Sequence, residues 1–541
     1  MIALRAFLFA WIALAPLLCL ALLAVPGGFA GAPDAAMAEP MRAGELLLNS
    51  LGSAIPAAVL AMLWMIPAAL VAMRIERGPA RALLIAMAVA PLFVSPAVVA
   101  VAGIRLLGAS GPVMNAWYAV LPLEGGAVRF APVYTLPGLS LMLAWSFAPV
   151  AMIASCAALS FADRNAEEAA RLDTTWAGVL ARVALPGAAP GIVGGALLIL
   201  LLALVEFGVP ESLRSMPVLV SEVYRQFGVY YSPGNAALAS LILAALAMVL
   251  LAILGRAWNP RASDEGESVQ SIRPATRAPI AWRALGWMTG TVPSLILFGV
   301  LVYTSIGPTG LLNTLWETWQ LAGSELLFSL RLAFLGGALS LGVGTLLGAG
   351  LATLRNPRTL RLLAVFGFVL PGPIVGVALK SLLLQPPGSL PLGLDDAMAW
   401  FDGTTGPLLF AWTLRFAPLV ALLVEYQLRS VPRDLIDAAR LDSPGIIGAM
   451  RTWGLRAAAP AMLAGGLASI ALVIGETGAC VLLIPPGPTT LSVRLMTLMH
   501  YAPTWEVSAL CLLLAMIPLA VLPPVAAVMI RLSRAPIGNT R

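Results

Sequence analysis

The sequence predicts an all-α polytopic membrane protein with about twelve transmembrane helices, arranged as two parallel repeats of six. Three observations predict this fold class. Of the 541 residues, 60% are hydrophobic and only 11% are charged, which is more apolar surface than a water-soluble core can bury. Apolar runs of about 20 residues, the length needed to cross a bilayer, recur along the chain. The pattern between these runs repeats after about 270 residues.

Twelve apolar runs are expected to form the crossings, six before a polar linker and six after it. The runs are 6–25, 49–73, 82–107, 136–160, 191–213, 235–255, 284–305, 326–354, 362–384, 407–428, 461–484 and 506–530. Residues 4–32 also resemble a secretory signal sequence. We expect an uncleaved anchor, because cleavage would spoil the match between the two halves.

The internal repeat divides the chain into 1–258, a linker at 259–283, and 284–541. Phe147 and Phe416 lie 269 residues apart, and Glu206 and Glu476 lie 270 residues apart. Each half has an even number of crossings and starts on the same side of the membrane. The repeats are therefore expected to be parallel and related by an axis along the membrane normal.

The arginines predict the orientation in the membrane. They concentrate in alternate loops, for example at Arg74 and Arg171, whereas the opposite loops are poor in basic residues and carry acids such as Asp402. Cytoplasmic loops retain Arg and Lys, so we expect both termini to be cytoplasmic in a bacterial inner membrane. The net charge of +6 reflects this topology, and no nucleic-acid partner is expected.

Paired prolines interrupt the third and ninth runs. Pro91 and Pro96 lie in the third run, and Pro371 and Pro373 lie at a comparable place in the ninth. Proline removes a backbone donor, and the freed carbonyl then needs a neighbour or a water-lined cavity. Each interruption is expected to be either a packing kink or part of a pathway.

A charged loop follows the fourth run of each half, at 161–190 and 429–460. The first contains Glu-Glu-Ala-Ala-Arg-Leu-Asp over 167–173, and the second contains Asp-Ala-Ala-Arg-Leu-Asp over 437–442. The alanine-rich core favours a helix, and a turn is expected directly after it. Each loop is therefore predicted to form a short helix, a turn and a second helix lying across the membrane face.

The pattern of an acidic residue and two alanines, followed further on by Leu-Pro, resembles the EAA loop of permeases of binding-protein-dependent ABC importers. The resemblance covers nearly the whole chain, and the doubled form is similar to the fused permeases of the iron(III) and thiamine import systems. It implies docking of two copies of a cytoplasmic P-loop ATPase and delivery of the solute by a periplasmic binding protein. The residues implied in ATPase coupling are Glu168, Ala169, Ala170, Asp173, Thr174, Asp437, Ala438, Ala439, Asp442 and Ser443.

The two loops also depart from the family pattern. Thr174 and Ser443 stand where the family has a glycine, and the first loop is one residue shorter before Leu-Pro. Arg456 stands where the second loop is expected to have proline. These departures affect the expected turn geometry and leave the docking interpretation in place.

The chain itself lacks a nucleotide-binding loop. Such a loop needs Gly-x-x-x-x-Gly-Lys followed by Ser or Thr, and Lys380 in the ninth run is the only lysine. We therefore expect no enzymatic activity and no cofactor bound by this chain, with ATP used by the partner subunit. The four cysteines have no paired spacing, so neither a disulfide framework nor a metal site is predicted.

Two acidic residues occupy matching places in the fifth and eleventh runs. Glu206 and Glu476 each precede a glycine, Gly208 and Gly478, by two residues. A charge at bilayer depth costs at least a few kcal/mol unless it faces protein or water. The resemblance implies that these helices line the translocation path, so all four residues are path candidates. A role of the carboxylates in helix packing is the alternative.

Two basic residues within the membrane runs, Arg415 and Lys380, are candidate counter-charges for these acids. The stretch 475–501 is similar to iron(III)-type permeases, which favours iron(III) as the solute. Thiamine, phosphonate and other small solutes are alternatives. A proton-coupled secondary transporter would also use two buried acids, but it would leave the two docking loops unexplained.

Overall fold

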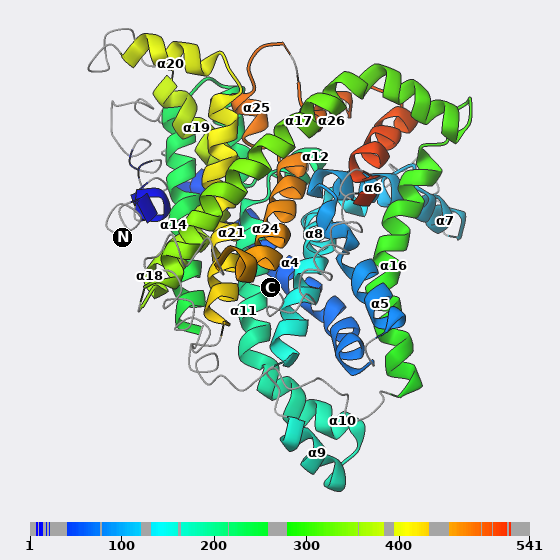
Figure 1. Ribbon diagram of the computed structural model, residues 1–541. Helices are drawn as coiled ribbons and strands as arrows, with labels where there is room; N and C mark the ends of the chain where they lie inside the picture. Colours follow the sequence, from blue (N-terminus) through cyan, green and yellow to red (C-terminus); the bar gives the residue numbers. More distant parts are fainter. Residues whose placement is uncertain are drawn as a thin grey trace, which may run out of the picture.

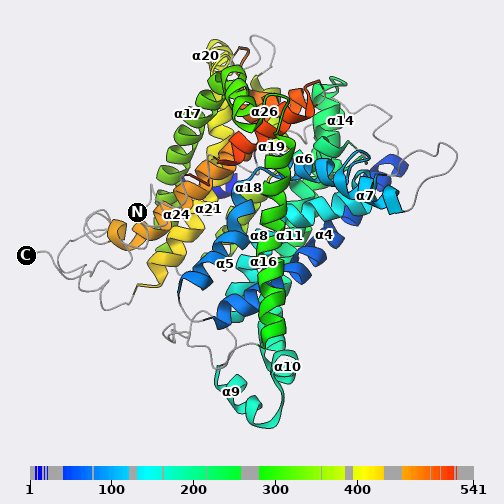
Figure 2. The same cartoon turned by 90° about the vertical axis from the view of Figure 1, so that its right-hand side faces the viewer.

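The computed structural model describes residues 40–75, 78–120, 131–160, 164–214, 216–257, 279–354, 356–383, 394–431, 454–487, 489–499 and 501–516, with short pieces of 7–21 and 519–520. The regular elements in these residues are helices, and most of them run along one bundle (Figure 1). Helices α9 (Arg164–Asp173) and α10 (Trp176–Val179) project at one end of the bundle, and α20 (Leu394–Asp402) lies at the other (Figures 1 and 2).

Nine helices among the described residues are long and apolar enough to cross a membrane, and one bent pair raises the number to ten. These spans correspond to ten of the twelve predicted runs, and the first and last runs lie partly outside the described residues. The single-helix spans are α4 (Pro40–Arg74), α8 (Leu136–Ser160), α11 (Leu185–Val205), α14 (Pro233–Ala257), α16 (Ile280–Thr304), α17 (Leu311–Ala352), α21 (Gly406–Arg429) and α24 (Leu455–Gly475). The protein is therefore a multi-span, all-helical membrane protein.

The predicted interruptions of the third and ninth runs are confirmed. The third run consists of α5 (Pro79–Val89), a short 3₁₀ turn η2 (Ala90–Phe93) and α6 (Pro96–Leu107), which continues toward α7 (Pro112–Val120). The ninth run consists of α18 (Arg358–Val369) and α19 (Gly372–Leu383), which meet at 85°. The residue before the proline, Ser95 or Leu370, is extended in both breaks, as the proline ring requires.

Three predicted helix boundaries were wrong. The fifth and eleventh runs end at Val205 and Gly475, eight and nine residues before the predicted ends, because Glu206 and Glu476 leave the helical conformation with ψ of 122° and 119°. Helix α17 starts at Leu311, well before the expected residue 326. Its first turns contain no proline and many good helix formers, so the helix continues beyond the apolar run.

Residues near the start of each half pack against the other half. Helix α16, which opens the second half, packs against α4, α5 and α6 of the first half (Figure 2). In return, Leu8 and Ile12 at the start of the chain are buried in a cluster with Leu347, Ala364 and other residues of α17, α18 and α21. The halves are thus interlocked.

Candidate translocation site and coupling loop

The fifth apolar run is interrupted after α11 by the acidic residue Glu206. Glu206 leaves the helix, and the chain resumes as the short helix α12 (Gly208–Leu213). The Glu206 carboxylate accepts a hydrogen bond from the backbone N–H of Gly208 at 2.7 Å. It therefore satisfies one of the donors that the start of a helix leaves without a partner.

The equivalent break after α24 is built in the same way and is reinforced by side chains. Glu476 accepts hydrogen bonds from the backbone N–H of Ala479 at 2.9 and 3.1 Å, just before α25 (Cys480–Leu483). It also accepts hydrogen bonds from Arg415 Nη1 at 3.0 Å and from Trp412 Nε1 at 3.2 Å. Only 12% of the Arg415 side chain and 8% of the Glu476 side chain are exposed.

The glycines after the two acids lie in close contact with neighbouring helices. A Cβ atom at Gly208 would lie 3.1 Å from Cβ of Ala97, in the first turn of α6. A Cβ atom at Gly478 would lie 2.5 Å from Cδ of Pro373, in the first turn of α19. The breaks in the fifth and eleventh runs therefore rest directly on the breaks in the third and ninth runs.

The acidic breaks of the two halves meet. Ser95 Oγ, at the break before α6, donates a hydrogen bond to the carbonyl of Gly475 at 3.0 Å across the interface between the halves. Glu206 also lies close enough to Arg415 and Glu476 to interact with both electrostatically. The breaks of the two halves are therefore in contact through Ser95 and Gly475.

The two candidate counter-charges have different partners. Arg415 is the counter-charge of Glu476, as expected for one of them. Lys380 does not contact either acid, because it binds the carboxylate of Asp402 at 2.6 Å. Asp402 ends α20, which brings this carboxylate back over α19.

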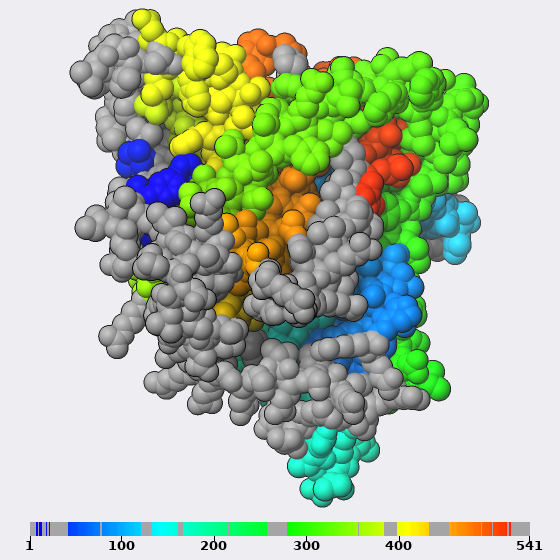
Figure 3. Space-filling model, in the orientation of Figure 1, coloured from blue at the N-terminus to red at the C-terminus, as the bar shows by residue number. Residues whose placement is uncertain are grey.

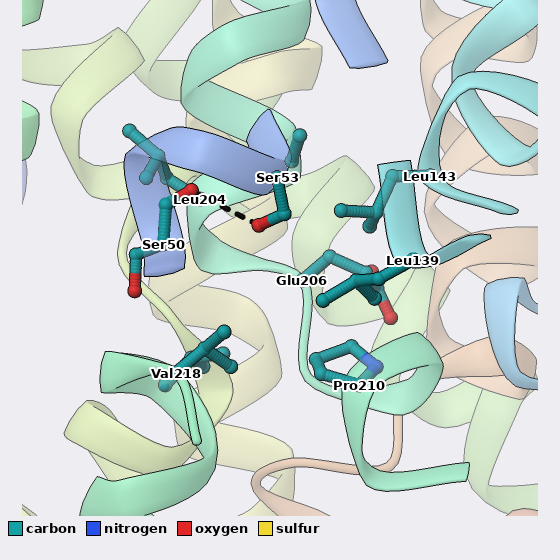
Figure 4. Close-up of a pocket in the computed structure, with 10 residues that line it drawn as sticks. Ser50, Ser53, Leu139, Leu143, Leu204, Glu206, Pro210 and Val218 are labelled. Atoms are coloured by element: carbon teal, nitrogen blue, oxygen red, sulfur yellow. Dashed lines mark hydrogen bonds between the residues drawn. The ribbon is translucent and has the colours of Figure 1, made fainter. Parts of the chain in front are cut away.

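A small cavity lies beside Glu206 (Figure 4). It has room for about one water molecule. Its lining combines the carboxylate, two serines of α4, and apolar side chains from α8, the end of α11 and residues 210–220. The lining residues are Ser50, Ser53, Leu139, Leu143, Ala203, Leu204, Glu206, Pro210, Val218 and Val220.

The first charged loop forms the predicted helix, turn and helix. Helix α9 ends at Asp173, and Thr175 caps α10 by accepting a hydrogen bond from the N–H of Gly178 at 3.4 Å. A π-helical turn, η4 (Leu180–Ala184), then leads into α11. The segment protrudes beyond the end of the bundle (Figure 3).

The predicted coupling residues of the first loop lie on this protrusion. Glu168, Ala169 and Asp173 are exposed, and Ala170 and Thr174 are half-buried. The sequence analysis did not single out a leucine in the same helix, Leu172, whose exposed fraction is 88%. Its signal in the sequence was an apolar residue within an otherwise polar helix.

Arg74 at the end of α4 anchors the first loop to the bundle. Its guanidinium contacts both carboxylate oxygens of Glu167 at 3.0 and 3.1 Å and lies 5.8 Å from the ring centre of Trp176. The ring of Trp176 in turn lies 5.1 Å from that of Trp282 in α16. We call Arg74, Glu167, Trp176 and Trp282 the loop joint. It connects the loop of the first half to the first helix of the second half.

The predicted coupling residues of the second loop, Asp437, Ala438, Ala439, Asp442 and Ser443, lie outside the described residues. The helix that leads into this loop is firmly held. Glu425 of α21 is buried and binds Arg361 of α18 and Arg429, each at 2.8 Å. Arg429 also donates hydrogen bonds to two carbonyls at the end of α17, those of Leu351 and Leu354.

Comparison with models of known protein families and with curated proteins finds no match to this sequence. The fold and the site define the class: the protein is a multi-span, all-helical membrane protein. Its two pairs of broken helices meet at buried charged residues.

Proposed function

We propose that the protein is the permease subunit of an ATP-driven ABC importer and forms the translocation path for a small solute. The observation that carries this proposal is the protruding α9–α10 segment. It exposes an apolar side chain, Leu172, beside the charged residues Glu168 and Asp173. A polar helix that projects from the membrane bundle is accessible to another protein, and this one stands at the place of the coupling loop in the ABC importer permeases that the sequence resembles. Two copies of a cytoplasmic P-loop ATPase, one for each charged loop, are the proposed occupants.

The loop joint supplies a route from the docked ATPase to the path. Glu167 and Trp176 move with the loop, Arg74 belongs to α4, and Trp282 belongs to α16. Closure of the ATPase subunits would therefore shift helices of both halves together. ATP can change the balance between inward-open and outward-open states only by its different affinity for the two states.

The charges at the broken helices support a cationic solute. Glu206, Glu476 and Arg415 carry a formal excess of one negative charge, and the breaks of the two halves are in contact there. We propose iron(III), delivered by a periplasmic binding protein at a bacterial inner membrane, as the solute. Thiamine, which is also a cation, is the alternative within this class, and an anionic phosphonate fits the charge less well.

A proton-coupled secondary transporter is the second candidate function. Broken helices with acids at the breaks are also typical of that class. The two classes differ in what should bind the protruding loop, because a secondary transporter needs no ATPase partner.

The test is purification of the native complex in mild detergent, with identification of the associated chains by mass spectrometry. We expect a P-loop ATPase at two copies per permease, with ATP hydrolysis stimulated by one loaded binding protein. Leu172→Asp and Glu168→Arg should release the ATPase. Leu312→Asp, at an 80% exposed leucine of α17, is the matched control and should retain it. A chain that purifies alone and whose uptake collapses with the proton gradient would refute the proposal in favour of the second candidate.

A further inference from the structure

The break after α24 is saturated by donors that the protein itself supplies. Arg415 and Trp412 donate to the Glu476 carboxylate, and two serine hydroxyls donate to the last carbonyls of α24. These are Ser492 Oγ to Ile474 O at 2.7 Å and Ser95 Oγ to Gly475 O at 3.0 Å. The Glu476 carboxylate is thus paired with a cation, and the last carbonyls of α24 accept hydrogen bonds.

Two equivalent hydrogen bonds align the two halves and identify which residue near Glu206 corresponds to Ser492. Ser50 Oγ accepts a hydrogen bond from the N–H of Leu219 at 2.9 Å, and Ser329 Oγ accepts one from the N–H of Leu491 at 2.7 Å. These two bonds are equivalent, so the residue after each leucine is equivalent too. Val220 therefore occupies the place of Ser492 and brings no hydroxyl.

The residues equivalent to the other three donors do not supply these hydrogen bonds either. Counted from Phe147 and Phe416, Leu143 takes the place of Trp412 and Ser146 takes the place of Arg415. The Ser146 hydroxyl is engaged within its own helix, donating to the carbonyl of Met142 at 2.9 Å. Counted from the break prolines Pro96 and Pro371, Leu370 takes the place of Ser95.

The cavity beside Glu206 lies where these donors are replaced. Leu143 and Val220 both line it, together with Ala203 and Leu204 of the last turn of α11 (Figure 4). The last turn of a helix leaves carbonyl oxygens without intrahelical donors and carries a partial negative charge, which favours a cation. The polar side chains of the lining are therefore all oxygen-bearing, namely the Glu206 carboxylate and the hydroxyls of Ser50 and Ser53, and they lie beside the carbonyl end of α11. Oxygen ligands suit a hard cation.

We propose that the cavity beside Glu206 is a binding site for a hard, oxygen-seeking cation. In the second half, Arg415 takes the equivalent place as a cation tethered to the protein, so Glu476 is structural and Glu206 contacts the cargo. The inference rests on the proposed function for the identity of that cargo, but not for cation binding itself. The described residues contain no cluster of three or more His, Cys, Asp or Glu side chains. Binding is accordingly weak and reversible, as passage through a path requires.

The test uses the purified full-length chain and Tb³⁺, a hard trivalent cation whose luminescence is sensitised by a nearby tryptophan. Trp412 beside Glu476 serves as the sensitiser. Glu206→Gln should weaken the sensitised binding by about tenfold or more, because it removes the only charged ligand of the cavity. Ser146→Arg, which places an arginine where the second half has one, should have the same effect.

The matched control is the double variant Lys380→Gln, Asp402→Asn, which removes a charge pair that contacts neither Glu206 nor Glu476 and leaves the net charge unchanged. It should retain Tb³⁺ binding within about twofold, a difference too small to represent a lost charged ligand. Thermal unfolding of each variant checks that the bundle is intact. Unchanged binding in Glu206→Gln, or loss of binding in the folded double variant, overturns the proposal. Because the assay uses the chain without an ATPase, its failure would leave the importer proposal to its own test.

Discussion

The loop joint gives the sharpest prediction for a single side chain, Arg74. Its side chain and that of Glu167 are only 10% and 13% exposed. A hydrogen bond between charged groups contributes about 1.5–3 kcal/mol, and the cation–π contact with Trp176 adds about 0.5–1 kcal/mol. Arg74→Ala should therefore weaken docking of α9 onto the bundle by roughly 2–4 kcal/mol, which corresponds to roughly 30- to 1,000-fold in the docking equilibrium.

Hydrogen exchange of the backbone amides in 164–184 measures this equilibrium directly. We expect faster exchange in α9 of the Arg74→Ala variant, with the rest of the bundle unchanged. Arg182→Ala, at an exposed arginine of the same loop, is the control and should change exchange by no more than about 0.5 kcal/mol. Equal protection of α9 in the wild type and in Arg74→Ala would show that covalent connection alone holds the loop and would refute the joint.

Three further predictions concern the breaks and the helix ends. Arg415→Ser should lower the free energy of unfolding by about 3 kcal/mol, because it leaves the Glu476 carboxylate buried without its cation. Adding Glu476→Gln should recover part of this loss. If thermal unfolding shows that the effects of the two substitutions simply add, the pairing is contradicted. Gly478→Ala should lower the unfolding temperature, because the added Cβ would clash with Pro373. Gly187→Ala is the control and should not lower it, since a Cβ there would meet nothing within 4 Å. Similar unfolding temperatures for both variants would argue against close contact at Gly478. Glu425→Gln should also destabilise by about 3 kcal/mol, since two arginines lose their shared acid, and an unchanged unfolding temperature would exclude that role.

Local chemistry made much of the architecture predictable. The spans follow from uninterrupted apolar runs, and the breaks before Pro96 and Pro371 follow from the missing donor and fixed φ of proline. The helix–turn–helix of the first loop follows from the alanine-rich core and the Thr175 cap. The early ends at Glu206 and Glu476 were missed, because apolar residues continue on both sides and the break depends on backbone donors that the carboxylates cap.

The sequence by itself determined the class of the protein, the places of its two proline breaks and the two acids that repeat between its halves. These properties depend on composition and on residues near one another in the chain. Only the tertiary structure decided that α16 packs on the first half, that Arg415 binds Glu476 while Lys380 binds Asp402, and that Arg74 joins the loop to the bundle. Periodicity tells which side of a helix is buried, but not which distant helix buries it. For that reason, the sequence does not show that Glu476 pairs with Arg415 whereas Glu206 lies beside a cavity. This difference appears only in the folded structure.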